Sequence, residues 1–180
     1  MEQAWIQVIG FAGTALVLLS FQFRSNRKLF LMQALGCVCF LVHFGLLGAY
    51  AGMLLNLFGI IRGYVMVQAE KGKTWANSRG MRILLPLLCL VMSLPSGSEG
   101  WLTLLPICGS LVETISQQRK NAKLIRLLKL FFCSPCWLVY NICSHSIPGA
   151  VTEIFCMLSV ILSIYRFGLK NLGQAQPAEK

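Results

Sequence analysis

The stretch CWLVYNICSHSIPGAVTEIFCMLSV, residues 136–160, carries one acid, Glu153, among apolar side chains. A charged group inside such a run is costly wherever the run is buried. The stretch FLVHFGLLGAYAGMLLNLFGI, residues 40–60, repeats the pattern more loosely, with Asn56 as its polar residue. Together the two stretches predict a repeated helical unit with a polar group inside each copy.

The composition indicates which solvent surrounds the chain. Of its 180 residues, 56% are hydrophobic and only 12% are charged, whereas soluble proteins are about 25% charged. The apolar residues fall in blocks close to the ~20-residue length of a membrane-spanning helix. The first block lacks the basic segment of a cleaved signal peptide, so we expect it to be retained. The sequence therefore predicts an all-α, polytopic membrane protein.

Seven apolar runs are expected to be helices. They cover roughly residues 5–23, 29–48, 51–68, 82–96, 101–117, 130–145 and 149–167. The fourth run is the shortest, so it is either a short span or a buried segment between neighbours. The distribution of charge favours a span, because only then do the basic loops all fall on one side of the membrane.

Basic residues follow the first, third, fifth and seventh runs, and the intervening loops hold none. They are Arg24, Arg27, Lys28, Lys71, Lys73, Arg79, Arg82, Arg119, Lys120, Lys123, Arg126, Lys129, Arg166, Lys170 and Lys180. The positive-inside rule then places the N-terminus outside and the C-terminus in the cytoplasm. We expect these loops to attract anionic lipid head groups, so the net charge of +10 does not require a nucleic-acid partner.

An internal repeat is also predicted. GTALVLLSFQFRSNRK at residues 13–28 matches GSLVETISQQRKNAKL at residues 109–124, which begins 96 positions later. A pair of ring side chains followed by a polar residue in the next helix occurs twice, 97 positions apart: Phe40, His43 and Asn56, then Trp137, Tyr140 and Glu153. Two copies of one three-helix unit account for both offsets.

The repeat predicts the organisation of the chain. Residues 1–68 form the first three-helix repeat, 69–100 a basic cytoplasmic loop and linker helix, 101–168 the second repeat and 169–180 a flexible cytoplasmic tail. One linker helix gives both units the same orientation, so seven transmembrane helices are expected as 3+1+3 with parallel repeats. Substrate sites of transporters built from such repeats lie between the halves, near the bilayer midplane.

Two resemblances follow from these motifs. A Trp-x-x-Tyr helix end, a Pro-containing turn and a polar residue in the third helix resemble the SWEET, SemiSWEET and PQ-loop superfamily. The segments LVHFGLLGAY, LLPICGSLVETIS, CWLVYN and TEIF resemble more closely the YgjV-type bacterial inner membrane protein family, over most of residues 5–168. The resemblances imply the bacterial inner (cytoplasmic) membrane, small-solute transport and assembly into a homo-oligomer. The pattern departs at Pro106 and Pro135, whose counterparts are missing in the first copy, and at Glu153, where the superfamily has Asn.

The candidate site combines the polar residues of the third helices with the ring side chains before them. Asn56 and Glu153 are expected to face each other across a central cavity, with Phe40, His43, Trp137 and Tyr140 as its outer walls. Aromatic faces above a polar floor suit a small polar solute. The carboxylate can bind a cation or exchange a proton. In the alternative, Glu153 is protonated and only joins two helices.

Arg62 and Glu113 form a second candidate pair. Each lies about 12 residues from the outer end of its run, or roughly 18 Å at ~1.5 Å per residue, and their charges are opposite. This predicts an ion pair toward the cytoplasmic side, which is either a gate that breaks as the inner mouth opens or a static bond between helices.

Three functions remain open. The first is a small-solute transporter, proton-linked through Glu153, and the second is a receptor, sensor or assembly protein on the same fold. The third is a membrane oxidoreductase using Cys133 and Cys136 of CSPC, which a cytoplasmic helix start without a βαβ pattern disfavours. His43 and His145 do not predict a metal site, and no motif predicts a cofactor. We therefore expect the protein not to be an enzyme.

Overall fold

The computed structural model describes residues 2–20, 23, 26–119 and 121–171, and it contains no strand among them. The α-helices are α1 Glu2–Ser20, α2 Asn26–Leu46, α3 Tyr50–Glu70, α4 Thr74–Asn77, α5 Arg79–Ser93, α6 Leu104–Gln118, α7 Ala122–Leu128, α8 Ser134–Cys143 and α9 Ile147–Asn171. Two 3₁₀ segments, η1 Leu94–Glu99 and η2 Trp101–Thr103, precede α6, and a π-helical segment, η3 Lys129–Cys133, joins α7 to α8. The all-α prediction is confirmed.

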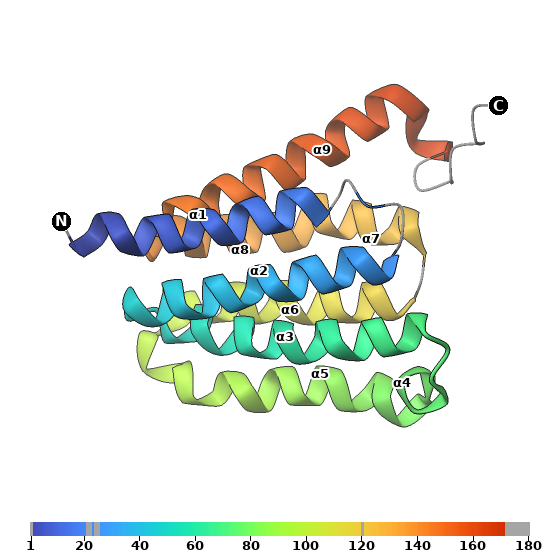
Figure 1. Ribbon diagram of the computed structural model, residues 1–180, viewed down its shortest axis with the longest axis horizontal. Helices are drawn as coiled ribbons and strands as arrows, with labels where there is room; N and C mark the ends of the chain where they lie inside the picture. Colours follow the sequence, from blue (N-terminus) through green and yellow to red (C-terminus); the bar gives the residue numbers. More distant parts are fainter. Residues whose placement is uncertain (1, 21–22, 24–25, 120, 172–180) are drawn as a thin grey trace.

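The long helices pack as a closed ring (Figure 1). Contacts run from α1 to α2, α3, α6, α8 and α9 in turn, and α9 packs back on α1. Helix α5 lies outside this ring, against α3 and α6. Side chains from six helices therefore point toward one shared interior.

Local sequence accounts for where the helices begin and end. Gly48 adopts a φ of 71° in the turn between α2 and α3, a conformation that costs glycine little. The side chains of Ser78 and Asn121 accept backbone N–H groups at the starts of α5 and α7, as N-cap residues do. Pro148 is the second residue of α9, where a missing N–H removes no helical hydrogen bond.

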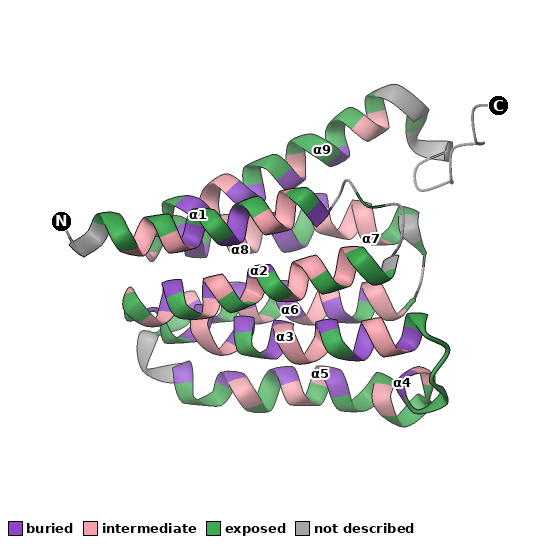
Figure 2. Ribbon diagram, in the orientation of Figure 1, coloured by how far each residue is buried: buried purple, intermediate pink, exposed green. Residues whose placement is uncertain are grey.

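Many large apolar side chains are exposed, among them Trp5, Val91 and Leu162, which are 72%, 60% and 59% exposed. Figure 2 shows exposed positions along each of the long helices. The polar residues Thr114, Ser134 and other hydroxyl-bearing side chains are buried instead. This distribution is the reverse of a soluble fold and is the one expected where lipid tails replace water.

Five helices are long and apolar enough to cross a membrane: Arg27–Leu46, Tyr50–Glu70, Arg79–Ser96, Lys123–Cys143 and Ile147–Tyr165. The apolar part of α1, Ala4–Ser20, is shorter. The fourth run, for which a span was favoured over a buried segment, corresponds to α5 with the first part of η1 and is one of these five. Helix α6, with 15 residues, is not among the five, so the seven-span arrangement stays a prediction.

The described basic residues outside the interior lie at one end of the bundle, on the right in Figure 1. They occupy the start of α2, the connection from α3 to α5, the end of α6 and α7: Arg27, Lys28, Lys71, Lys73, Arg79, Arg82, Arg119, Lys123 and Arg126. Arg24, Lys120 and Lys180 lie outside the described residues, as does most of the predicted tail. One end of the bundle is therefore strongly cationic, as the positive-inside argument requires.

Candidate functional site

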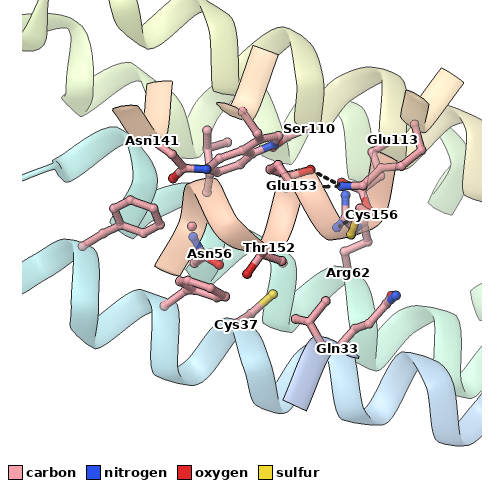
Figure 3. Close-up of a pocket in the computed structure, with 18 residues that line it drawn as sticks. Gln33, Cys37, Asn56, Arg62, Ser110, Glu113, Asn141, Thr152, Glu153 and Cys156 are labelled. Atoms are coloured by element: carbon pink, nitrogen blue, oxygen red, sulfur yellow. Dashed lines mark hydrogen bonds and ion pairs between the residues drawn. The ribbon is translucent and has the colours of Figure 1, made fainter. Parts of the chain in front are cut away.

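A cavity of about 120 Å³ lies inside the ring of helices (Figure 3). Each of the six ring helices lines it, and so does η3. The lining residues are Val17, Gln33, Cys37, Phe40, Phe44, Leu55, Asn56, Gly59, Arg62, Ser110, Glu113, Lys129, Trp137, Asn141, Gly149, Thr152, Glu153 and Cys156. The cavity is thus shared by the N-terminal and C-terminal parts of the chain.

Most lining positions correspond under the offsets that define the predicted repeat. With an offset of 96 or 97 positions the matched pairs are Val17 and Glu113, Gln33 and Lys129, Phe40 and Trp137, Phe44 and Asn141, Leu55 and Thr152, Asn56 and Glu153, and Gly59 and Cys156. Equivalent positions in two copies therefore face the same space. Asn56 and Glu153, on which the candidate site was built, both line the cavity.

Arg62 and Glu113 meet across the contact between α3 and α6. The guanidinium Nη2 lies 3.5 Å from the carboxylate Oε1, and Nη1 donates to Oγ1 of Thr114 at 3.3 Å. Gln117 Nε2 donates to the same carboxylate oxygen at 3.1 Å. This pair, expected from depth and opposite charge alone, also lines the cavity. It therefore lines the same cavity as Asn56 and Glu153.

Glu153 has a charged partner that the sequence reasoning did not find. Lys129 Nζ lies 3.2 Å from Oε2 and 3.4 Å from Oε1 of Glu153. Lys129 was assigned to a cytoplasmic loop as one of the topology-setting cations, and this assignment was wrong. Its side chain is only 22% exposed and reaches into the bundle interior.

The π-helical segment η3 places Lys129 at the cavity. Pro135 lies at the start of α8, and a proline there has no N–H and its ring crowds the carbonyl four residues before it. The wider π turn over Lys129–Cys133 accommodates this disruption within one continuous helix. A signal was present in the sequence, because Lys129 borders an apolar run that contains Pro135.

His43 does not line the cavity, which corrects the prediction that it forms part of the wall. Its ring is fully buried, with Nδ1 2.8 Å from the carbonyl of Ile6 and Nε2 2.8 Å from Oγ of Ser146. Since a carbonyl only accepts, Nδ1 carries the proton, and the Ser146 hydroxyl donates to Nε2. Ser146 Oγ in turn accepts from the backbone N–H of Gly149. His43 therefore joins α1, α2 and the α8–α9 turn.

Tyr140 is also absent from the cavity lining. Its hydroxyl accepts the backbone N–H of Gly52 at 2.8 Å, one of the first-turn N–H groups of α3 that have no partner within their own helix. Phe40 and Trp137 do line the cavity as expected, together with Phe44, which was not predicted. Helical spacing places a ring near the interior but does not decide whether it faces the cavity or a neighbouring backbone.

The eight cysteines are all free, and Cys133 is buried. Within the described part of the chain, no group of three or more metal-ligating side chains comes together. Glycines instead mark close helix contacts. A Cβ on Gly10 would lie 2.3 Å from Pro148 of α9, and one on Gly109 would lie 3.0 Å from Trp137.

Comparison with known proteins decides the family. A family model described as bacterial inner membrane protein, Imp-YgjV, matches residues 4–171. The chain belongs to the Imp-YgjV family. This membership, together with the apolar helices, makes it an integral, multi-pass protein of the bacterial inner membrane. Neither a curated protein nor a solved structure matches the chain.

Proposed function

We propose that this Imp-YgjV protein carries a small polar solute across the bacterial inner membrane, through the cavity between its N-terminal and C-terminal helices. One observation supports the proposal above all others. Four ionisable side chains from α3, α6, η3 and α9 line a single cavity in an otherwise apolar bundle. A charge at the centre of a membrane helix costs about 2.5–3.5 kcal/mol on insertion scales, so two ion pairs inside the bundle favour a functional site.

The proposed carrier consists of two parallel three-helix units, residues 1–68 and 101–168, in a seven-span 3+1+3 arrangement. The helix contacts support it, because α3 packs on α6 and α9 packs on α1, so that the last helix of each unit touches the first helix of the other. The matched positions of the cavity lining support it further. Movement of one unit against the other would open the cavity to alternate sides.

Arg62–Glu113 is the proposed gate, because this ion pair spans the two units at the α3–α6 contact. At the other contact, Thr14 and Thr152 share a hydrogen bond of 2.8 Å between α1 and α9. In one arrangement the ion pair at the α3–α6 contact would be broken and the hydroxyl bond at the α1–α9 contact kept. In the other arrangement the hydroxyl bond would be broken and the ion pair kept. The proposed orientation has the N-terminus outside and the cationic end in the cytoplasm.

Reconstitution tests the proposal. Purified protein in liposomes is assayed for uptake of radiolabelled amino acids, amines and polyols, with Glu153→Gln as the test variant and Glu70→Gln as the matched control on an exposed face. We expect uptake above empty liposomes that Glu153→Gln reduces at least about tenfold and Glu70→Gln leaves unchanged. Repeating the assay with and without a pH gradient tests the predicted proton link through Glu153.

A failed uptake assay would favour the other function class. If wild-type protein moves none of these solutes, the transport proposal is rejected, and a receptor or assembly role on this fold takes its place. Equal uptake by wild type and Glu153→Gln would reject the assignment of the cavity as the transport site. The next measurement would then be a pull-down with the purified protein, to test whether a partner binds the cationic end of the bundle.

A further inference from the structure

The cavity is electrically balanced by the residues that line it. The described lining residues include two acids, Glu113 and Glu153, and two cations, Arg62 and Lys129, each within 3.5 Å of an opposite charge. A solute with a net charge would add a charge that has no partner in the cavity. In a medium without water such an uncompensated charge is strongly unfavourable. A lone cation meets carboxylates that are already paired, and a lone anion meets cations that are already paired.

The cavity is also small. Its volume of about 120 Å³ is less than half of the lower end of the ~300–1,000 Å³ range of pockets that take drug-sized ligands. In the conformation described, the cavity therefore suits a molecule much smaller than those ligands.

The Lys129–Glu153 pair offers both charges to one such molecule. The two side chains come from different elements, η3 and α9, and both line the cavity. A molecule that carries an ammonium and a carboxylate could separate them by replacing one ion pair with two. Every charge would stay paired, and the net charge of the cavity would remain zero.

We infer that the solute of the proposed carrier is a small zwitterion, an ammonium carboxylate of the size of glycine or β-alanine. This inference rests on the proposed function, because it names the substrate class of the same cavity. The ammonium binds the carboxylate of Glu153, and the carboxylate of the solute binds Lys129. Asn56, whose Nδ2 donates to the carbonyl of Gly52 at 2.8 Å, presents its amide to the same space.

Equilibrium binding tests the inference separately from transport. Purified protein in nanodiscs is titrated with glycine and β-alanine, with acetate as carboxylate-only probe, methylammonium as ammonium-only probe and ethylene glycol as neutral probe. We expect one of the zwitterions to bind at least about 30-fold more tightly than each other probe, because a buried charged partner is worth about 2 kcal/mol or more. Equal or tighter binding of any single-charge or neutral probe, or no zwitterion binding, would overturn the inference.

Two variants test whether Glu153 binds the ammonium and Lys129 binds the carboxylate of the solute. Glu153→Gln leaves Lys129 unpaired and should weaken zwitterion binding by about 30-fold or more while making acetate the preferred probe. Lys129→Gln leaves Glu153 unpaired and should make methylammonium the preferred probe. Retention of zwitterion preference in both variants would overturn the placement. If either single variant fails to fold, the neutral double variant Glu153→Gln/Lys129→Gln must lose zwitterion binding without gaining another preference.

The two proposals fail in different ways. Binding of glycine or β-alanine without uptake into liposomes would reject carriage and leave the ligand class standing. Uptake of a polyol or an amine that no zwitterion competes with would reject the ligand class and leave carriage standing. Uptake that is specific for a zwitterion, and that Glu153→Gln abolishes, supports both.

Discussion

The N-terminal and C-terminal halves of the ring differ most where they face the cavity. At matched positions the first half presents Val17, Phe44 and Leu55, and the second half presents Glu113, Asn141 and Thr152. Helix α2 is one regular helix of 21 residues, whereas its counterpart from Ala122 to Cys143 contains a π-helical segment. The same arrangement thus carries a mostly apolar wall on one side and a mostly polar wall on the other.

The difference shows how a repeated unit acquires a site. Only Arg62 of the four cavity charges comes from the first half, and it pairs with Glu113 of the second. Lys129 and Glu153 both belong to the second half, and their matches in the first half are the uncharged Gln33 and Asn56. The symmetric contacts hold the ring together, and the asymmetric side chains supply its chemistry.

The largest effect on stability is expected from removing the charge of Lys129, which has no charged counterpart in the first half. Lys129→Met leaves the Glu153 carboxylate buried without its partner, which should lower the free energy of unfolding by about 3–5 kcal/mol. Chemical unfolding of the protein in detergent micelles measures it. Lys123→Met, on the exposed side of α7, is the matched control and should change stability by less than about 0.5 kcal/mol. Restoration by Lys129→Met/Glu153→Gln would attribute the loss to the unpaired charge, and a double variant as unstable as the single one would contradict this.

A second comparison uses His43 and Tyr140, which hold the same position in the two halves. His43→Leu leaves the Ile6 carbonyl and the Ser146 hydroxyl without their partner, and should cost about 2–4 kcal/mol of unfolding free energy. Tyr140→Phe leaves one N–H of α3 unpaired and should cost about 1–2 kcal/mol. Thermal unfolding ranks the two variants. A larger loss for Tyr140→Phe would show that the matched positions do not differ as their hydrogen bonds indicate.

The smallest expected difference is between two matched glycines. A Cβ on Gly149 would lie 2.3 Å from Oδ1 of Asn141, and one on Gly52 would lie 2.8 Å from the ring of Phe44. Gly149→Ala should therefore cost about 2–3 kcal/mol of unfolding free energy and Gly52→Ala about 1–2 kcal/mol, since overpacking a tight contact costs about 1–3 kcal/mol. Gly80→Ala is the control, because the nearest atom to its Cβ is 3.9 Å away. Equal stability of Gly149→Ala and Gly80→Ala would show that the α8–α9 contact can yield.

Hydrophobic runs were enough to predict the helices, because segments near the bilayer thickness must be helical to satisfy their backbone groups. The two interior ion pairs were harder. Arg62 and Glu113 could be paired from their depth and opposite charge, and the structure brings them together. Lys129 was missed because a basic residue at the end of an apolar run has the same pattern whether it borders a loop or turns inward. Only the π turn, which depends on how Pro135 is accommodated, decides between these alternatives.

The π turn also constrains how the length of this helix can change during evolution. A π turn holds one more residue than an α-helical turn, so the faces before and after η3 are offset by about 100°. Loss of one residue within Lys129–Cys133 would convert the segment to a regular helix and rotate the part that precedes it around the helix axis. Lys129 would then turn toward lipid, and Glu153 would be left without its cation. A single-codon deletion at this point would thus do the damage of a charge substitution while leaving every side chain of the cavity in the sequence.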